Sequence, residues 1–392
     1  MIGVEEHRQR ILGAVRPLEA ERVPASAALG RTLRAAAVAP DDVPVFANSA
    51  MDGFAVRFDD VREASAARPV RLRVVADLPA GTDADPAIGP GEAARIMTGA
   101  PVPTDADAVV PFEDTAGGLA DSVAHAVVTT APRRRHVHVR PRGEDAAGGD
   151  EIIPAGTRLG SRQLAAISAA GIAEVTVSRR PRVVVLSTGD ELVETGATAR
   201  RGQVFESNSV LVASLVAEAD AQVVRTARVR DDPAALRREL ETAADADAVI
   251  TTGGISAGAY EVVKQAAPME FVRVGMQPGK PQGFGAGAPL LFGLPGNPGG
   301  AAVSFEVFVR PALLAMQGRT ELFRRIVLLP VATGWTSRVG REEYRSVRLG
   351  ADGVIPLPGG PIALGAAEAY AVIPADTGEV RAGDLVSVML VS

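Results

Sequence analysis

The sequence predicts a multidomain chain in which an α/β domain with a parallel sheet stands between two β-rich regions. From residue 181 onward, short all-apolar runs alternate with helical stretches, which is typical of strands buried on both faces. Residues 56–132 are rich in Val, Gly, Pro and Thr in short runs, and this composition favours a small β-rich module. Beyond about residue 322 the helical patterns stop, and strand-like runs separated by Gly and Pro predict a terminal β domain.

Length and composition are those of a globular protein. The chain has 392 residues, of which 47% are hydrophobic, and this is enough for two to four domains with buried cores. No apolar run approaches the roughly 20 residues of a membrane-spanning helix. The start MIGVEEHRQR lacks the pattern of a signal peptide. We therefore expect a cytoplasmic location and no membrane partner.

Charge and residue usage exclude several kinds of site. The absence of cysteine excludes disulfides, thiolate metal ligands and cysteine nucleophiles. Four scattered histidines disfavour a histidine-rich metal site. A formal net charge of −6 argues against general nucleic-acid binding, although a local site can still hold an anionic small ligand.

The sequence pattern of the N-terminal part changes several times between predicted helix, strand-rich and basic segments. Residues 4–20 predict a short amphipathic helix, and a basic run at 133–145 leads out of the β-rich segment. The stretch 161–171 predicts a helix with Ser161 as its N-cap and Gly171 just past its end.

The α/β part alternates strands with helices and ends its strands in loops of unusual composition. Strand patterns occur in RVVVLS, QVVRTARV, DAVITT and PLLFGL. Helices are expected at 208–219, 232–244, 259–267 and 299–316. The loops are STGDEL at 187–192, TTGGISAG at 251–258 and LPGNPGG at 294–300. Because ligands of open α/β sheets bind outside the carboxyl ends of the strands, we expect these loops to share one crevice.

The loop TTGGISAG supports two interpretations. Gly253, Gly254 and Gly258 would let main-chain N–H groups approach a phosphate, while Ser256 and the following helix add donors. A tight turn that needs positive φ explains the same glycines about equally well. The loop LPGNP likewise forms either a rim of the site or only a rigid turn.

The acidic residues of the loops also leave alternatives open. Asp190 and Glu191 suit a phosphate site if Mg²⁺ lies between carboxylate and phosphate. Alternatively, Asp190 caps a following helix and Glu191 strengthens its first turn; the pattern favours the cap for Asp190 and leaves Glu191 undecided. Asp145, after several arginines, predicts a solvated ion pair, and Asp52, before a glycine, predicts a turn.

Nine motifs occur in a characteristic order. They are NSAMDGFA, RIMTGAPVP, RPRGED, LSTGDEL, SN at 207–208, TTGGISAG, PGKP, FGLPGNP and GREEYRSVR. In this order and at these spacings the chain resembles the MoeA family of molybdopterin molybdenumtransferases, which includes the C-terminal part of gephyrin, from near residue 5 to near residue 390. The resemblance implies a multidomain α/β plus β fold: a two-segment linker domain (1–44 and 140–177), an inserted β-rich domain (45–139), a molybdopterin-binding α/β domain with a parallel sheet (178–321) and a C-terminal β-barrel-like domain (322–392).

The resemblance also implies an enzyme of molybdenum cofactor biosynthesis. Family members insert molybdate into adenylated molybdopterin and release AMP, so Mg²⁺ is the implied cofactor, and molybdate and adenylated molybdopterin are the implied substrates. They are homodimers whose active site forms between one subunit's α/β domain and the other's inserted domain. The adenylyltransferase of the same pathway is a further candidate partner.

Site residues follow from the matching motifs. Those implied as catalytic are Asp52, Thr98, Asp145 and Glu191. Those implied to hold or orient Mg²⁺ and molybdate are Glu191, Asp145 and Glu261. Those implied to bind the substrates are Gly253, Gly254, Ser256, Gly258 and Lys280 for phosphate, Pro295, Asn297 and Pro298 for the pterin side, and Arg341 and Arg345 for an anion.

Four positions depart from the family pattern. Glu261 stands where relatives usually have Asp, Gln277 stands where many have Lys, Gly-Gly follows FGLPGNP, and the loop PGGPIALGAAEAY contains no serine. These changes either tune affinity or mark a paralogue with altered metal choice. Two other functions also stay open, a molybdopterin-binding carrier or scaffold without catalysis and an ATP-dependent molybdopterin adenylyltransferase. Retention of Asp52, Asp145 and Glu191 favours catalysis.

Overall fold

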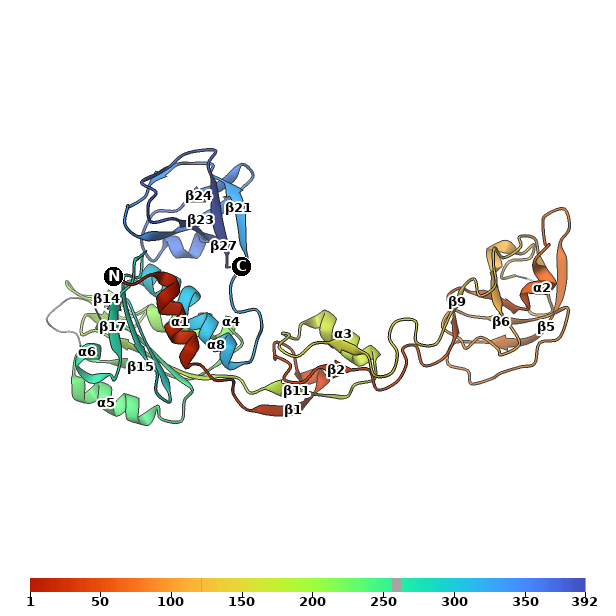
Figure 1. Cartoon of the computed structure of the whole chain (residues 1–392), viewed down its shortest axis with the longest axis horizontal. Helices are drawn as coiled ribbons and strands as arrows, with labels where there is room; N and C mark the ends of the chain where they lie inside the picture. Colours follow the sequence, from red (N-terminus) through yellow and green to blue (C-terminus); the bar gives the residue numbers. More distant parts are fainter. Residues whose placement is uncertain (121, 256–261, 392) are drawn as a thin grey trace.

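The chain is elongated, with its α/β part at one end and a long arm that leads away from it (Figure 1). The structure is a computed structural model that describes residues 1–120, 122–255 and 262–391. We call residues 20–178 the arm and residues 48–140, at its far end, the inserted module. The chain leaves the α/β part along β1 (Ala20–Pro24) and returns along β11 (Glu174–Ser178), and these two strands pair antiparallel.

A six-stranded sheet forms the centre of the α/β domain. Its order is β15-β12-β16-β20-β19-β17, and the first four strands are parallel, as their apolar runs predict. β19 and β17 run antiparallel at one edge, so the sheet is mixed rather than wholly parallel. The strands are β12 (Arg182–Thr188), β15 (Gln222–Val229), β16 (Ala248–Thr252), β17 (Glu270–Arg273), β19 (Pro281–Gly285) and β20 (Leu290–Leu294).

Helices cover both faces of this sheet. Val183 and Val185 of β12 belong to a core shared with α1, α4 and the helical run from α7 to α8, whereas Val184 and Leu186 belong to a core shared with α5 and α6. Two buried faces explain why the strand is apolar without alternation. The helices are α1 (Val4–Ala14), α4 (Asn208–Glu218), α5 (Pro233–Thr242), α6 (Val262–Ala266), α7 (Pro298–Ser304) and α8 (Arg310–Met316).

The first helix packs on the α/β domain. Val4 and Ile11 are buried in its core, and α1 contacts α8. Residues 4–14 therefore belong with the α/β domain by their contacts, whereas the expected linker segment 1–44 includes them. The helix is also shorter than the expected 4–20, because Pro17 disfavours helical backbone in the residue before it.

The run Pro298–Met316 is a long apolar helix composed of α7, a π-helical turn at Phe305–Val309 and α8. It has 19 residues, and its most apolar 18-residue window has a mean hydropathy of 1.3. By length and composition this is enough to span a membrane, so the expectation that no such run exists is wrong. However, 83% of its most apolar window is buried inside the protein. This burial identifies the run as a core helix of the α/β domain.

The C-terminal sheet is attached to the α/β domain by strand pairing. β18 (Met276–Gln277) of the α/β domain pairs with β23 (Glu342–Gly350). The sheet order is β18-β23-β25-β27-β21, β24 pairs with β23, and a bridge between Val331 and Val354 joins the far end to β24, so that the sheet curls on itself. The other strands are β21 (Ile326–Pro330), β24 (Gly353–Pro356), β25 (Ala369–Ile373) and β27 (Leu385–Leu390), with β22 (Trp335–Thr336) paired to β26 (Glu379–Val380).

The arm contains two β pairs, one helix and the inserted module. β2 (Ala37–Val38) pairs with β10 (Glu151–Ile153), beside α3 (Ser161–Ala169). The N-cap of α3 is Gly160, whose N–H donates to the Gln163 side chain, so the cap predicted at Ser161 is wrong by one residue. The inserted module is a sheet of order β7-β4-β6-β5-β8, with a short pair of β3 (Asn48–Ser49) and β9 (Val139–Arg140) at its base. Its strands are β4 (Gly53–Val56), β5 (Val70–Leu78), β6 (Glu92–Ile96), β7 (Ala108–Pro111) and β8 (His125–Val128).

Candidate active site

Three adjacent strands of the α/β sheet end at one cavity. This cavity, which we call the strand-end cavity, has a volume of about 400 Å³ and lies outside the carboxyl ends of β12, β16 and β20. All three predicted loops contribute to it, so the prediction of a shared crevice is confirmed. Its lining residues include Thr188, Gly189, Glu191, Asn208, Asp231, Thr252, Gly253, Gly254, Pro295 and Asn297.

Gly253 and Gly254 lie where the backbone requires glycine. Their φ values are +85° and +64°. A Cβ on Gly253 would lie 2.7 Å from the carbonyl oxygen of Thr188, so only glycine fits there. The N–H of Gly253 donates to the carbonyl of Leu294 at 3.1 Å, so this amide is already used within the fold. The remaining residues predicted in this loop, Ser256, Gly258 and Glu261, lie outside the described residues.

The acidic wall of the strand-end cavity consists of Glu191 and Asp231. After β12 the chain continues into the short strand β13 (Leu192–Val193) and not into a helix, so the helix cap predicted for Asp190 is wrong. The Asp190 carboxylate instead accepts a hydrogen bond from the backbone N–H of Asp231, at 3.4 Å. Asp231 is absent from the predicted site. Its place in the sequence could have identified it, because Asp231 follows strand β15 as Glu191 follows strand β12.

Two buried polar atoms beside the strand-end cavity have no hydrogen-bond partner within the described residues. They are Asn208 Oδ1 and Thr252 Oγ1, and both residues line the cavity. The other amide atom of Asn208 donates to the carbonyl of Gly296, at 2.8 Å. An unsatisfied buried polar atom costs about 1–3 kcal/mol, so these two atoms are suited to hydrogen-bond a polar ligand in the cavity.

The third loop supplies the opposite rim of the strand-end cavity. Pro295 and Asn297 line it. Asn297 is also the N-cap of α7, since its side-chain oxygen accepts from the N–H of Gly300, and Pro298 is the first helical residue. The N-cap and first-turn positions therefore give this Asn-Pro pair a structural role, whether or not it also contacts a ligand.

A second cavity of about 220 Å³ lies where the α/β domain meets the C-terminal sheet. We call it the junction cavity; Gln277 lines it from one side and Arg345 from the other, and Asn297 lines both cavities. Gln277 Oε1 is buried without a hydrogen-bond partner in the described part of the chain. Arg345 Nε forms an ion pair with Glu343 at 3.5 Å, and Glu343 also lines this cavity, so the cavity holds this free acceptor and one paired charge.

Basic residues gather around Lys280, which lines another cavity of about 270 Å³ together with Arg273. Arg341, then the partial burial of the side chain, and then Arg273 and Arg338 hold the pKa of Lys280 below its ordinary value. Lys280 and Arg341 are both predicted site residues, and they come from different domains. Cations this close to one another favour the binding of an anion between them.

The inserted module holds Asp52 and Thr98. One carboxylate oxygen of Asp52 accepts from the Thr98 backbone N–H at 2.6 Å and from the Thr98 hydroxyl at 2.7 Å. These two bonds hold the pKa of Asp52 below its usual value, so the carboxylate is ionised at neutral pH. Asp145 accepts two bonds of 2.8 Å from Arg140, and it is an exposed ion pair as its neighbours predict.

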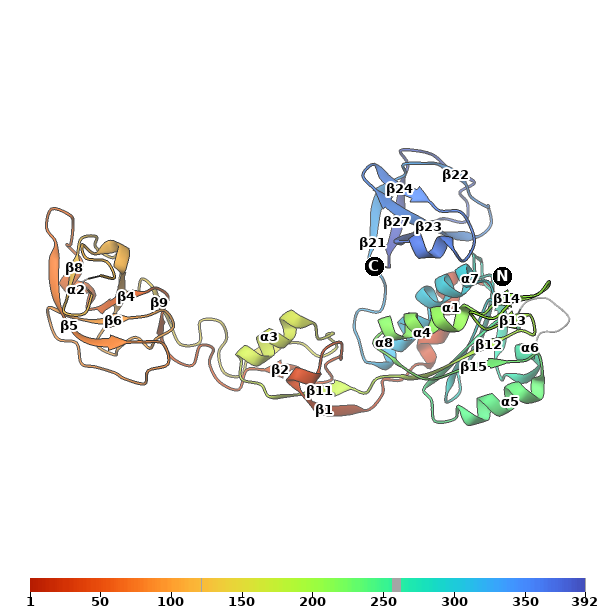
Figure 2. The same ribbon diagram turned by 180° about the vertical axis from the view of Figure 1, so that it is seen from behind.

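Within one chain the predicted catalytic residues fall into two groups. Glu191 lies in the strand-end cavity, whereas Asp52 and Thr98 belong to the inserted module, and Asp145 pairs with a residue of β9 at its base (Figures 1 and 2). The predicted metal set was Glu191, Asp145 and Glu261; Glu261 lies outside the described residues, and Glu191 and Asp145 are not brought together within a single chain.

Metal-binding side chains are sparse in the described ranges, which contain no group of three or more His, Cys, Asp or Glu suited to a metal ion. In the strand-end cavity two acidic residues, Glu191 and Asp231, share the wall. Mg²⁺ is commonly held by one or two carboxylates together with phosphate oxygens, and these two residues meet that requirement.

Comparison with known proteins gives the same picture along the whole chain. A protein-family model described as the MoeA N-terminal region (domain I and II) matches residues 2–171, and one described as a probable molybdopterin binding domain matches residues 184–315. Among solved structures, a molybdopterin biosynthesis MoeA protein from Pyrococcus horikoshii OT3 has a TM-score of 0.86 at 27% identity and covers 100% of both chains. Another MoeA structure from Pyrococcus has a TM-score of 0.82 at 31% identity, covering 100% of this chain and 99% of its own.

Curated relatives align over nearly their full length. The chain is 42% identical to molybdopterin molybdenumtransferase 2 of Mycobacterium tuberculosis (strain ATCC 25618 / H37Rv), covering 98% of both sequences. It is 30% identical to the molybdopterin molybdenumtransferase of Staphylococcus aureus (strain N315), covering 99% of this chain and 95% of the relative. The resemblance carried by the nine motifs is thereby confirmed, and the chain belongs to the MoeA family of molybdopterin molybdenumtransferases.

Proposed function

We propose that this protein inserts molybdate into adenylated molybdopterin and releases AMP in a Mg²⁺-dependent reaction, as a cytoplasmic homodimer. The strand-end cavity carries the proposal, because it brings together two carboxylates, two polar atoms that have no hydrogen-bond partner among the described residues, and a glycine-lined backbone. Such a combination suits a ligand that has both phosphates and polar ring atoms. Relatives named for this transfer reaction align with 98% of the chain.

The substrate's phosphates bring negative charge toward an acidic wall. Mg²⁺ held by Glu191 and Asp231 would neutralise phosphate oxygens and polarise the phosphoanhydride. Gly254 keeps the backbone free of a side chain at the cavity, and Asn208 Oδ1 and Thr252 Oγ1 remain to hydrogen-bond the substrate. In this arrangement the protein orients the reacting groups and stabilises charge, and it supplies no covalent nucleophile.

Molybdate is a tetrahedral dianion, and the junction cavity is the site that we assign to it. Arg345 brings a positive charge to its lining, where it forms an ion pair with Glu343, and Gln277 Oε1 is free of a partner among the described residues. Gln277 contributes an amide where many relatives have a lysine, so molybdate affinity is expected to be weaker than with lysine. Asn297 borders both cavities, so molybdate bound in the junction cavity would lie next to the pterin-binding side.

The homodimer follows from the separation of the two residue groups. Figure 1 shows the inserted module at the end of the arm far from the α/β domain, and Asp52 and Thr98 belong to this module. A second copy related by two-fold symmetry would bring its inserted module to that cavity, and each chain would complete the site of the other. The active site of the proposed enzyme thus contains Glu191 from one subunit and Asp52 from the other.

AMP release tests the proposed reaction directly. Purified protein is incubated with adenylated molybdopterin, Mg²⁺ and molybdate, without ATP, and AMP is quantified. We expect molybdate-dependent release that falls by roughly 100-fold or more in Glu191→Gln, because charge stabilisation at the anhydride is lost.

Glu194→Gln is the matched control, because Glu194 is an exposed acid on the same loop and is absent from the lining of the cavity. Its activity should equal that of the unmodified protein. Tight binding of the pterin with no AMP release by the unmodified protein would contradict the transferase function and would support a carrier. Activity only with added ATP would instead support an adenylyltransferase.

A further inference from the structure

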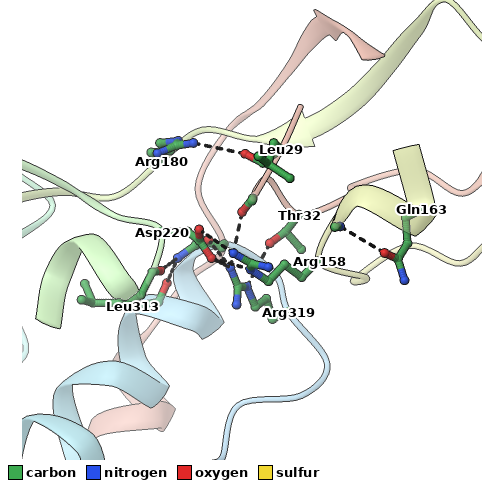
Figure 3. A network of polar contacts seen from close by, with 12 residues as sticks. Leu29, Thr32, Arg158, Gln163, Arg180, Asp220, Leu313 and Arg319 are labelled. Carbon is green, nitrogen blue, oxygen red and sulfur yellow. Dashed lines mark hydrogen bonds and ion pairs between the residues drawn. The ribbon is translucent and has the colours of Figure 1, made fainter. Parts of the chain in front are cut away.

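The arm is held to the α/β domain by more than its two covalent connections. Asp220 follows α4 and Arg319 follows α8, so both belong to the α/β domain. Figure 3 shows them side by side, facing Arg158 and Thr32 of the arm. This contact is separate from the strand-end and junction cavities.

Asp220 is the centre of the contact. Its two carboxylate oxygens accept hydrogen bonds from Nε and Nη2 of Arg158, at 2.7 and 3.0 Å. Arg319 Nη2 donates to the same carboxylate, at 2.5 Å. The side chains of Asp220 and Arg319 are only 13% and 7% exposed, so this ion pair is shielded from water and salt.

Arg319 also reaches the arm directly. Its Nε donates to the hydroxyl of Thr32 at 3.2 Å, and its Nη2 lies 3.5 Å from the carbonyl of Gly30. Gly30 has φ +77°, and a Cβ there would lie 2.5 Å from Asp220 Oδ1. The arm thus carries a glycine at the point where the carboxylate approaches its backbone.

The charge state of the contact is stable at neutral pH. Burial alone would raise the pKa of Asp220, but the hydrogen bonds from Arg158 and Arg319 outweigh this effect and hold the pKa below its usual value. Breaking one side of such a buried pair is costly, because it leaves a charge without compensation. The contact therefore favours one relative placement of arm and domain.

We infer that Asp220, Arg158 and Arg319 form a clamp that fixes the direction of the arm. Through this clamp the three residues act as positioning residues for the shared active site. Two chain connections by themselves permit hinge motion, and a third, buried point of attachment removes it. The direction of the arm decides where Asp52 and Thr98 are presented to a second subunit. This last step depends on the proposed function, whereas the fixed direction does not.

Spin-label distance measurements on the full chain test the clamp. The protein has no cysteine, so Arg162→Cys on α3 and Glu241→Cys on α5, both exposed, take labels at two defined places. Labelled chains are diluted into unlabelled protein so that only distances within one chain are observed. We expect one narrow distance distribution, and its loss in the double variant Arg158→Gln/Thr32→Val, which leaves the Asp220–Arg319 pair intact.

Arg22→Gln is the matched control for loss of an arginine. It breaks an ion pair with Glu174 within the arm whose side chains are 73% and 50% exposed, and the distribution should stay narrow. An unchanged narrow distribution in the double variant would overturn the clamp. Gly30→Ala, which keeps every charge but places a methyl group against Asp220, should broaden the distribution as well.

AMP release measured on the same samples tests the positioning role. A broadened distribution with a lowered kcat and unchanged pterin affinity supports it, because the strand-end cavity itself is untouched. A broadened distribution with unchanged kcat would overturn the positioning role. If the unmodified protein releases no AMP, the proposed function fails, and the distance distributions still decide whether the clamp exists.

Discussion

Asp52 keeps its negative charge because Thr98 donates to it twice, from its backbone N–H and from its hydroxyl. A carboxylate whose pKa is lowered in the folded state stays ionised below its usual pKa and is protonated only as the pH falls through the lowered value. Thr98→Val removes the hydroxyl bond and keeps the backbone bond. We therefore expect the pKa of Asp52 to rise toward its usual value and the acidic limb of the pH–activity profile to move to higher pH.

The inserted module offers a close control for this prediction. Thr104 donates to Asp85 in the same way, from its N–H at 2.9 Å and its hydroxyl at 2.8 Å, and lowers the pKa of that carboxyl. Thr104→Val should leave the pH–activity profile unchanged if only Asp52 takes part in the reaction. Equal shifts in both variants would mean that the profile reports the stability of the module rather than the charge of Asp52.

At the scale of one element, the turn after β16 depends on the backbone of Gly253. Gly253→Ala adds a methyl group 2.7 Å from the Thr188 carbonyl and strains a φ of +85°, so we expect a loss of unfolding free energy on the order of 1–3 kcal/mol. Gly196→Ala, at φ +91° with open space around it, measures the strain without the clash. Urea unfolding should show a larger loss for Gly253→Ala; equal losses would contradict the importance of the close approach.

The elements also show how far the sequence determines the fold. Three of the four parallel strands, β12, β16 and β20, are buried on both faces, which leaves an uninterrupted apolar run such as RVVVLS. The fourth, β15, lies at the edge of the sheet and alternates exposed with partly buried residues. β19, with the sequence PQGFG, carries no such run, because two of its five residues are glycines that pack against neighbouring segments such as Phe271 and Leu291. A helix was expected after STGDEL because its acidic residues are typical of a helix cap. The helix is absent, because residues 193–207 provide no apolar face that could pack on the domain.

The candidate site shows the same limit. Glu191, Pro295 and Asn297 could be placed at one cavity from the strand ends alone, because adjacent parallel strands end together. Asp231 was missed, because its neighbour Asp232 is a helix cap and the pair has the composition of an ordinary helix start. Contacts between distant segments, such as Asp220 with Arg158, leave no local pattern in the sequence at all.

At the scale of the whole molecule, the arm separates the residues that the proposed reaction requires together (Figure 2). If the site is shared between subunits, Glu191 and Asp52 act in one site but come from different chains. Their separation then has a measurable consequence, because two inactive variants can restore each other's function. A site built within one chain has no such property.

Mixing Asp52→Asn protein with Glu191→Gln protein after dissociation and reassembly tests this consequence. Each variant alone should be inactive in molybdate-dependent AMP release. A mixed dimer has one site with both Glu191 and Asp52 intact and one site that lacks both, so random reassembly should restore about a quarter of the unmodified activity. Activity no higher than that of the separate variants would contradict the shared site. Mixing two preparations that carry the same substitution gives the baseline, because every site in those dimers lacks the same carboxylate.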